Sequence, residues 1–239
     1  MSRNINKKWR LWMAVAGLMA ASASSMAQTQ VVLETTMGNI RIELNEKDCP
    51  LHSKNFKDLV EKGFYDSLLF HRLAYNFVVQ AGDPNSKNAE PGKLLGNVEE
   101  PYTIPAEICY PQLMHQRGAL CMAREGDANN PERASSAYQF YIVYGRRYDD
   151  AMLDKVQERL DTTTKGQVKL TPEVREIYKA KGGLPHLDGQ YTVFGEVVEG
   201  LDVVKNMQMA EVDENSRPLN NIRILRAYHI QSQEVSHQP

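Results

Sequence analysis

The sequence predicts a mainly β domain in which short strands form a closed barrel or sandwich. Three observations lead to this fold class. Apolar runs of strand length recur along the chain and are separated by turn residues. Only two segments outside the middle of the chain have the pattern of core helices. One long charged segment, 146–184, interrupts the series of strands, and a connection of this length in a compact domain indicates a helical insertion.

The first 27 residues have the pattern of a cleaved leader. Lys7, Lys8 and Arg10 precede an apolar run over 11–21, and small residues then lead to Ala27. This order of basic, apolar and small residues is typical of a secretory signal peptide with cleavage after Ala27. The apolar run is shorter than the roughly 20 residues that a membrane-spanning helix needs. We therefore expect an exported protein, periplasmic or secreted, that has no stable membrane insertion.

The charge of the mature chain is negative. Residues 1–27 carry four basic and no acidic residues, so their removal changes the formal charge from −2 to −6. Such a chain lacks the basic surface that nucleic acids or anionic membranes attract. The remaining length suits one domain with an insertion and a real hydrophobic core. We expect a monomer that binds no nucleic acid.

The cysteines argue against a disulfide framework. Cys49, Cys109 and Cys121 are odd in number and form no C-x-x-C pair. Cys121 lies in an apolar run, where a buried thiol behaves as a small hydrophobic side chain. A bridge between Cys109 and Cys121 stays possible in an oxidising compartment, because spacing alone does not show whether the geometry fits.

Metal, nucleotide and acyl-transfer chemistry find no support in the motifs. His52, His71, His115 and His186 lack the i, i+4 spacing of a helical zinc site. The segment 126–132 (GDANNPE) lacks the ligand spacing of a calcium loop. The chain has no G-x-x-x-x-G-K-[ST] phosphate loop and no G-x-S-x-G elbow. We expect no cofactor and no metal.

The elements before residue 110 follow from local patterns. Residues 31–36 and 39–44 alternate in character around Met37-Gly38, which predicts a β-hairpin. Pro50 then opens a helix that ends near Gly63. The apolar residues that share one face of this helix are Phe56, Leu59 and Val60. A second hairpin follows at 70–83, and residues 84–107, rich in Gly, Pro, Asn and Glu, predict a long loop, with or without a short strand in it.

The second half contains further strands and the insertion. Within the insertion, two charged pieces predict helices at 149–160 and 172–180, the latter with Pro172 in its first turn after Thr171. Strand-like runs lie at 118–123, 139–144, 191–198 and 222–230, with a short helix over 201–207 and a C-terminal tail over 231–239.

Four separated stretches resemble a known family. They are FHRLAYNFVVQAGD (70–83), RGALCMAR (117–124), AYQFYI (137–142) and LDGQYTVFGEVVEGLDVV (187–204). In this order they are similar to the signature segments of the cyclophilin-type peptidyl-prolyl cis-trans isomerases, and the resemblance extends over nearly all of 31–230 except the insertion. The resemblance implies one domain over 28–239: an eight-stranded antiparallel barrel capped by two helices, with the active site on its outer face.

The resemblance also implies roles for individual residues. Arg72 would be the catalytic arginine, and Gln80 would accompany it. The other residues that it places at the site are Phe77, Val78, Tyr141 and Leu187 in the proline pocket, and Ala123, Arg124 and Gln139 along the peptide groove. Taken alone, each has an ordinary explanation as a solvated strand residue or as core packing. Four matching stretches in order favour the functional interpretation.

Several positions depart from the commonest family pattern. Val78 stands where Met is usual, which keeps an apolar wall but makes it shorter and stiffer. Tyr141 replaces Phe and adds a hydroxyl that needs a partner or water. Arg124 replaces Asn, which is tolerable if only its backbone contacts substrate. Tyr191 stands where many members have His, and His186 where many have Trp; both are still expected to contact the bound peptide.

Strand alternation supports only part of this pocket. Val78 and Gln80 fall on one face, as a pocket wall and its polar partner should. Phe77 falls on the opposite face by strict alternation, although the resemblance places it in the pocket. Its position at the start of the strand, beside the turn at 74–76, is one explanation. His71 is expected to be structural, because the implied mechanism needs no base.

The expected function is catalysis of rotation about X–Pro bonds in unfolded or folding exported proteins. A guanidinium suits this task because it stays charged and presents a fixed fork of donors. No nucleophile, proton shuttle or metal is required. The alternative is a weakly active proline-binding chaperone or interaction module on the same barrel. An intact Arg72 and Gln80 favour the enzyme, because a pure binder has less need of them.

Overall fold

The computed structural model describes residues 29–231. The predicted signal peptide and residues 232–239 of the predicted tail lie outside this range. The helices are α1 (Pro50–Glu61), α2 (Asp150–Thr163), α3 (Pro172–Ala180) and α4 (Leu201–Gln208), with 3-10 turns η1 (Pro84–Ser86) and η2 (Pro185–Leu187). The strands are β1 (Thr29–Thr35), β2 (Gly38–Leu44), β3 (Arg72–Leu73), β4 (Val78–Ala81), β5 (Thr103–Ile104), β6 (Ala119–Met122), β7 (Ser135–Ser136), β8 (Phe140–Val143), β9 (Val193–Glu199) and β10 (Ile224–Gln231). Within the described range, no helix combines the length and apolar character that crossing a bilayer requires.

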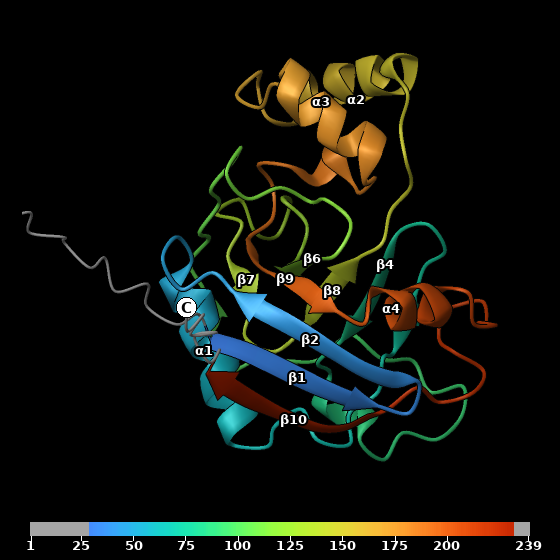
Figure 1. Ribbon diagram of the computed structural model, residues 1–239. Helices are drawn as coiled ribbons and strands as arrows, with labels where there is room; N and C mark the ends of the chain where they lie inside the picture. Colours follow the sequence, from blue (N-terminus) through green and yellow to red (C-terminus); the bar gives the residue numbers. More distant parts are fainter. Residues whose placement is uncertain (1–28, 232–239) are drawn as a thin grey trace, which may run out of the picture.

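Eight of these strands form one curled antiparallel sheet (Figure 1). Their order is β10-β1-β2-β9-β6-β8-β4-β3, and β5 and β7 form a separate pair. The chain just before β3 also meets the chain at the start of β10. The Phe70 N–H donates to the Ile222 carbonyl at 2.9 Å, and the Ile224 N–H donates to the Leu68 carbonyl at 2.8 Å. The predicted mainly β fold is therefore confirmed as a curled sheet, whereas full closure into a barrel stays a prediction.

The concave side of the sheet holds the main core. Leu120, Met122, Phe140, Ile142 and Phe194 point into it and are fully buried. Helix α1 covers one end through Phe56, whose ring packs against the rings of Phe140 and Phe194 at centroid distances of 5.3 and 5.5 Å. Helix α4 contributes Val203, Val204 and Met207 to the same core. These are the two core helices that the apolar periodicity predicted.

The opposite face of the same strands is also apolar and buried. Ala119 and Cys121 of β6 alternate with the core residues of that strand, and Tyr141 and Val143 of β8 do the same. Side chains of successive strand residues point to opposite faces, so β6 and β8 are buried on both sides. An antiparallel sheet commonly leaves one face to solvent. The second buried face is where the candidate site lies.

The insertion forms a small helical lobe with its own core. Helices α2 and α3 lie together at the top of Figure 1, apart from the sheet. The Asp149 carboxylate caps α2 by accepting from the Met152 N–H at 2.8 Å, and the Thr171 hydroxyl oxygen accepts from the Val174 N–H at 3.4 Å. The buried residues of the lobe are Tyr148, Leu153, Leu160, Val168, Leu170, Val174 and Tyr178. Both predicted helices are present, and α2 extends beyond its predicted end to Thr163.

The two ends of the lobe are joined where it leaves the sheet. The Gly183 N–H donates to the Arg146 carbonyl at 2.9 Å, and the Arg146 N–H donates back to the Gly183 carbonyl at 3.4 Å. Gly145 has a φ of 60°, and a Cβ there would collide with the backbone of Gly183. Glycine is therefore needed for this close approach. The lobe leaves and re-enters the sheet at neighbouring residues.

The second hairpin is shorter than its apolar residues suggest. Strand β3 contains only Arg72 and Leu73, and β4 begins at Val78, so Phe77 belongs to the turn and not to the strand. The loop predicted over 84–107 contains η1 and β5. All three cysteines have free thiols, so the possible bridge between Cys109 and Cys121 is not formed.

Candidate active site

A cavity of about 160 Å³ opens on the outer apolar face of the sheet. We call it the notch. Its lining residues are Arg72, Phe77, Val78, Gln80, Ala123, Arg124, Tyr141, Leu187 and Tyr191. All nine are among the eleven site residues that the sequence predicts. The remaining two, Gln139 and His186, lie immediately beside the notch: Gln139 bonds to Gln80, and the ring of His186 stacks on that of Phe77.

Neighbouring strands bring these residues together. Arg72 of β3 lies opposite Gln80 of β4, and Gln80 in turn lies opposite Tyr141 of β8. Phe77 reaches the notch from the turn, where its carbonyl accepts hydrogen bonds from the Tyr144 and Gly145 N–H groups at 2.9 and 3.0 Å. These two bonds hold the turn against β8. Phe77 therefore lines the notch because strand alternation does not apply to it.

A chain of amide groups orients Arg72. One guanidinium N–H of Arg72 donates to Gln80 Oε1 at 3.2 Å, and Gln80 Nε2 donates to Gln139 Oε1 at 3.1 Å. Gln139 Nε2 then donates to the Gly96 carbonyl at 3.1 Å. Each carboxamide has one acceptor end and one donor end, so this series of hydrogen bonds fixes the orientation of both side-chain amides. Gln139, which is buried, acts through Gln80 and does not line the notch.

The Arg72 guanidinium keeps most of its donors available. It is half-buried and lies 5.6 Å from the centroid of the Phe77 ring. Within residues 29–231 it makes one side-chain hydrogen bond, to Gln80, and no ion pair. A guanidinium carries five N–H donors. Most of them therefore remain for a group bound in the notch.

The hydroxyl of Tyr141 has a buried partner. It lies 3.2 Å from His115 Nε2, while His115 Nδ1 lies 3.0 Å from Asp188 Oδ1. A carboxylate only accepts hydrogen bonds, so in the neutral imidazole Nδ1 carries the proton and Nε2 accepts from the tyrosine. The Tyr178 hydroxyl of α3 donates to Asp188 Oδ2 at 2.6 Å. Burial and the Asp188 charge hold the pKa of Tyr178 well above its usual value, so it stays a donor.

Arg124 supports the notch without presenting its charge to it. Its guanidinium donates to the Gln190 carbonyl at 2.8 Å, pairs with Asp127 at 2.6 Å, and lies 4.4 Å from the centroid of the Tyr191 ring. The side chain is almost fully buried by these contacts. The side chain that replaces the usual Asn thus fixes Tyr191 as a wall.

His186 and His71 have different surroundings. His186 stacks on Phe77 with ring centroids 6.1 Å apart and planes 14° apart. Burial, with Arg159 nearby, lowers the pKa of His186 to about 4. His71 is only 3 % exposed, and neither ring nitrogen has a hydrogen-bond partner. Burial lowers its pKa to about 4 as well, against an opposing contribution from Asp83.

Three functional neighbours were missed by sequence reasoning. His115 bonds to the Tyr141 hydroxyl, Asp188 bonds to His115, and Tyr178 donates to Asp188, yet the three residues come from separate parts of the chain. The sequence did signal that a tyrosine at position 141 needs a partner, but not which one. Within the described residues, no group of three or more His, Cys, Asp or Glu side chains is arranged to hold a metal ion.

Comparison with known proteins gives a consistent result. The family model for "Cyclophilin type peptidyl-prolyl cis-trans isomerase/CLD" matches residues 30–229. The peptidyl-prolyl cis-trans isomerase cypE of Dictyostelium discoideum is 30% identical over 203 residues, which are 84% of this chain and 98% of that protein. A peptidyl-prolyl cis-trans isomerase-like 1 of Neurospora crassa is 28% identical over 208 residues, 87% of this chain and 98% of that protein.

Solved structures agree on the fold. A crystal structure of a cyclophilin-type peptidyl-prolyl cis-trans isomerase from Cryptosporidium parvum aligns with a TM-score of 0.59 at 24% identity, over 86% of this chain and 99% of that chain. A second crystal structure of that enzyme, in the presence of the dipeptide Ala-Pro, aligns with a TM-score of 0.58 at 25% identity, over 85% and 99%.

Proposed function

The chain belongs to the cyclophilin-type peptidyl-prolyl cis-trans isomerases, and from that premise we propose how its notch accelerates rotation of an X–Pro bond. Uncatalysed rotation is slow because the imide nitrogen shares its lone pair with the carbonyl, which gives a barrier of about 18–20 kcal/mol. At the twisted geometry the nitrogen regains that lone pair and becomes an acceptor. A donor aimed at this nitrogen stabilises the twisted state more than the planar one, which is the condition for catalysis.

Arg72 is the donor in this proposal. The observation that carries it is the combination of unused guanidinium donors with an amide relay that fixes the side chain beside an apolar cavity. Phe77, Val78 and Tyr141 would hold the proline ring and keep water from competing for the donor. A preorganised donor in a water-excluded site is worth much more than one in water. The substrate is a proline-containing peptide segment, consistent with the Ala-Pro dipeptide named for the related crystal structure.

We propose further that the clients are exported proteins. The support is the order of basic, apolar and small residues that ends at Ala27, which is typical of a secretory signal peptide. The enzyme would then assist folding outside the cytoplasm, in a periplasm or in the medium, as a monomer.

We also propose that the curled sheet closes into a barrel. The backbone bonds of Phe70 and Ile224, together with an isolated bridge between Leu69 and Arg223, support closure between the two edges of the sheet. Closure would hold the outer edge of β3, the strand of Arg72, against the chain at the start of β10.

The test compares isomerase activity of the wild type, Arg72→Ala and Arg72→Lys on Ala-Pro peptides. Loss of one preorganised donor typically costs about 100- to 1,000-fold, so we expect kcat/KM of Arg72→Ala to fall by that factor. Arg72→Lys keeps the charge but loses the planar fork, and we expect it to recover only a small part of the rate. Unchanged turnover in Arg72→Ala would contradict the proposed mechanism. Equal and negligible turnover in all three proteins would favour the binding module.

A further inference from the structure

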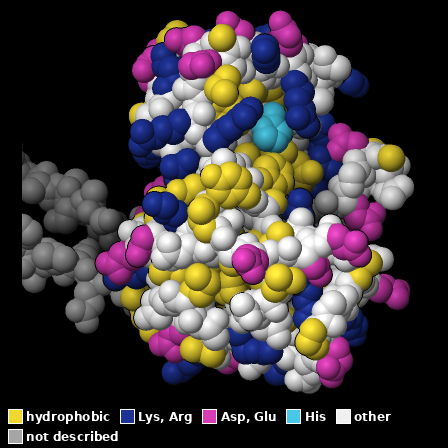
Figure 2. Space-filling view, turned by 90° about the vertical axis from the view of Figure 1, so that its right-hand side faces the viewer, with side chains coloured by type: hydrophobic (Ala, Val, Ile, Leu, Met, Phe, Trp, Pro, Cys, Tyr) yellow, Lys and Arg dark blue, Asp and Glu magenta, His cyan; other side chains and the backbone are white. Residues whose placement is uncertain are grey.

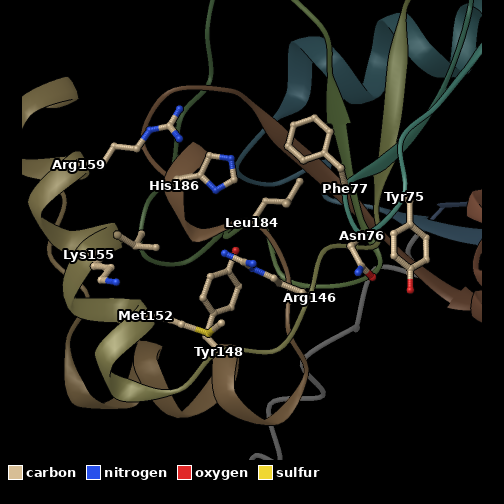
Figure 3. Close-up of a pocket in the computed structure, with 11 residues that line it drawn as sticks. Tyr75, Asn76, Phe77, Arg146, Tyr148, Met152, Lys155, Arg159, Leu184 and His186 are labelled. Carbon is tan, nitrogen blue, oxygen red and sulfur yellow. The ribbon is translucent and has the colours of Figure 1, made fainter. Parts of the chain in front are cut away.

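A larger cavity lies beside the notch, between the helical lobe and the sheet (Figure 3). Its volume is about 670 Å³, and we call it the insertion groove. One wall is α2, and the other is the turn that carries Tyr75, Asn76 and Phe77. Leu184 and His186 lie between these walls. Figure 2 shows hydrophobic side chains, a histidine and several Lys and Arg side chains gathered between the upper lobe and the rest of the molecule.

The insertion groove adjoins the notch at Phe77. Phe77 lines both cavities, and His186 stacks against it with centroids 6.1 Å apart. An extended peptide advances about 3.3–3.6 Å per residue, so residues a few positions from a proline in the notch can reach the adjoining insertion groove. A single bound peptide can therefore occupy both cavities.

One face of α2 is built for the insertion groove. Met152, Lys155, Val156 and Arg159 line it, and their i, i+3, i+4, i+7 spacing places them on one side of the helix. Leu153 and Leu160 are fully buried within the core of the lobe. The groove-lining face thus combines Met152 and Val156, which also pack against the core of the lobe, with cationic side chains that extend beyond that core.

The charge of the insertion groove is positive and unbalanced. Arg146, Lys155 and Arg159 line it, and no acidic residue does. Elsewhere on the lobe, Asp150, Asp154 and Asp161 pair with Arg175, Lys179 and Lys169 of α3 and the loop before it. By contrast, no ion pair in the described part of the chain involves the three groove cations. A concave surface lined by one sign of charge concentrates the opposite charge.

The floor of the insertion groove is apolar and carries no charge near neutral pH. Leu184 and Tyr148 contribute apolar surface, which the ring of Phe77 extends from the adjacent wall. Because burial and the nearby cations lower the pKa of His186 to about 4, this ring is neutral and adds another stacking surface. An occupant that matches both features has an anionic group on a short apolar stem, as the side chains of Glu and Asp have.

From these observations we propose that the insertion groove binds an acidic side chain of the same peptide whose proline occupies the notch. The helical lobe then gives the isomerase a preference for proline segments with Glu or Asp about two to four residues from the proline. This inference rests on the proposed function, because it requires proline to bind in the notch.

The experiment uses the full chain and peptides that share an Ala-Pro core. One peptide of each pair carries Glu two, three or four residues from the proline, on either side, and its partner carries Gln there. The rate kcat/KM is measured by NMR exchange at low and high salt. We expect one Glu peptide to be isomerised about 5- to 10-fold faster than its Gln partner at low salt, and the difference to shrink at 1 M salt, where the Debye length is about 3 Å.

Two charge-matched variants test whether this preference comes from the insertion groove. Lys155→Gln/Arg159→Gln removes two groove cations, whereas Arg147→Gln/Lys165→Gln removes two cations of the lobe that do not line the groove. We expect the first variant to lose the preference for Glu and to keep its rate on Gln peptides. The second variant should behave as the wild type.

The outcomes separate this inference from the proposed function. Equal rates on Glu and Gln peptides in an active wild type would contradict the proposed binding of an acidic side chain in the insertion groove. They would not affect the proposed isomerase mechanism. Equal loss of preference in both double variants would also contradict the groove proposal, because net charge and not the groove would then be responsible. If no peptide is isomerised and Arg72→Ala changes nothing, the proposed mechanism is contradicted, and the groove proposal that rests on it is contradicted as well.

Discussion

The hydroxyl of Tyr141 shows how one residue serves both the notch and the stability of the protein. Its ring lines the notch, but its hydroxyl bonds to His115 Nε2 at 3.2 Å, away from the space where proline would lie. Only the apolar part of the Tyr141 side chain therefore faces the notch. The polar part continues through His115 to the buried carboxylate of Asp188.

Tyr141→Phe tests this division of roles. We expect kcat/KM to be unchanged, because the lost hydroxyl does not face the substrate. The free energy of unfolding should fall by about 1–3 kcal/mol, because His115 Nε2 becomes a buried acceptor without a donor. Urea titration and an isomerase assay measure the two effects. Tyr228→Phe is the control, because no hydrogen bond of that hydroxyl is found among residues 29–231; a matching stability loss there would contradict the argument.

At the residue scale, the sequence predicted which residues line the notch, but not the contacts that hold those residues in place. Stretches quoted from four places in the chain contain all nine lining residues. The position of Phe77 did not follow from strand alternation, because alternation does not reveal that β4 begins one residue later. The role of the Arg124 side chain did not follow either, since its partners Gln190 and Asp127 are brought together only by tertiary structure.

At the scale of elements, the helical lobe is both attached to the site and separable from the sheet. Tyr178 of α3 donates to Asp188, which connects the lobe to the residues beneath the notch. At the same time, its two ends meet at Arg146 and Gly183. Charge patterning predicted helices here, but it did not predict a groove, because a groove requires knowing which face of α2 turns toward the sheet.

Excision of the lobe separates these two connections. Replacing residues 148–181 with Gly-Gly should leave a folded domain, because Arg147 and Gly182 adjoin the hydrogen-bonded pair Arg146 and Gly183. We expect kcat/KM on Gln peptides to change by less than about tenfold, equivalent to ~1.4 kcal/mol, and the preference for Glu peptides to disappear. Circular dichroism and the NMR exchange assay provide the measurements. A folded variant that is inactive on every peptide would show that the lobe supports the notch itself.

At the scale of the whole molecule, buried histidines make stability depend on pH. The pKa of His71 is lowered from 6.5 to about 4 by burial, and the pKa values of His52 and His186 are lowered too. A group with a depressed pKa binds fewer protons in the folded state than in the unfolded state within this window. Its contribution to stability is therefore fully present above pH 6.5 and is lost as the pH falls toward 4.

His71→Gln measures this contribution. Because one pKa unit corresponds to 1.36 kcal/mol, we expect the wild type to lose about 3 kcal/mol more than His71→Gln between pH 6.5 and 4. Denaturant titrations at several pH values give the two slopes. Parallel curves for the wild type and His71→Gln would rule out His71 as the source.

The secondary structure and fold class were the features most readily predicted from the sequence. Strand runs, the two core helices and the helical insertion all follow from periodicity and breakers, because these patterns act over a few residues. What could not be predicted is that β6 and β8 are buried on both faces. Cys121 and Tyr141 look like ordinary apolar strand residues, and only the assembled sheet shows that they form a second, outward-facing cluster.

The joined ends of the lobe, at Arg146 and Gly183, have a consequence for divergence among related proteins. A segment that departs from and rejoins its host through adjacent residues can lengthen, shorten or change in composition without shifting the strands beside it. Under the proposed role of the insertion groove, substitutions in the lobe can therefore change which peptides are preferred without altering the strands that position Arg72.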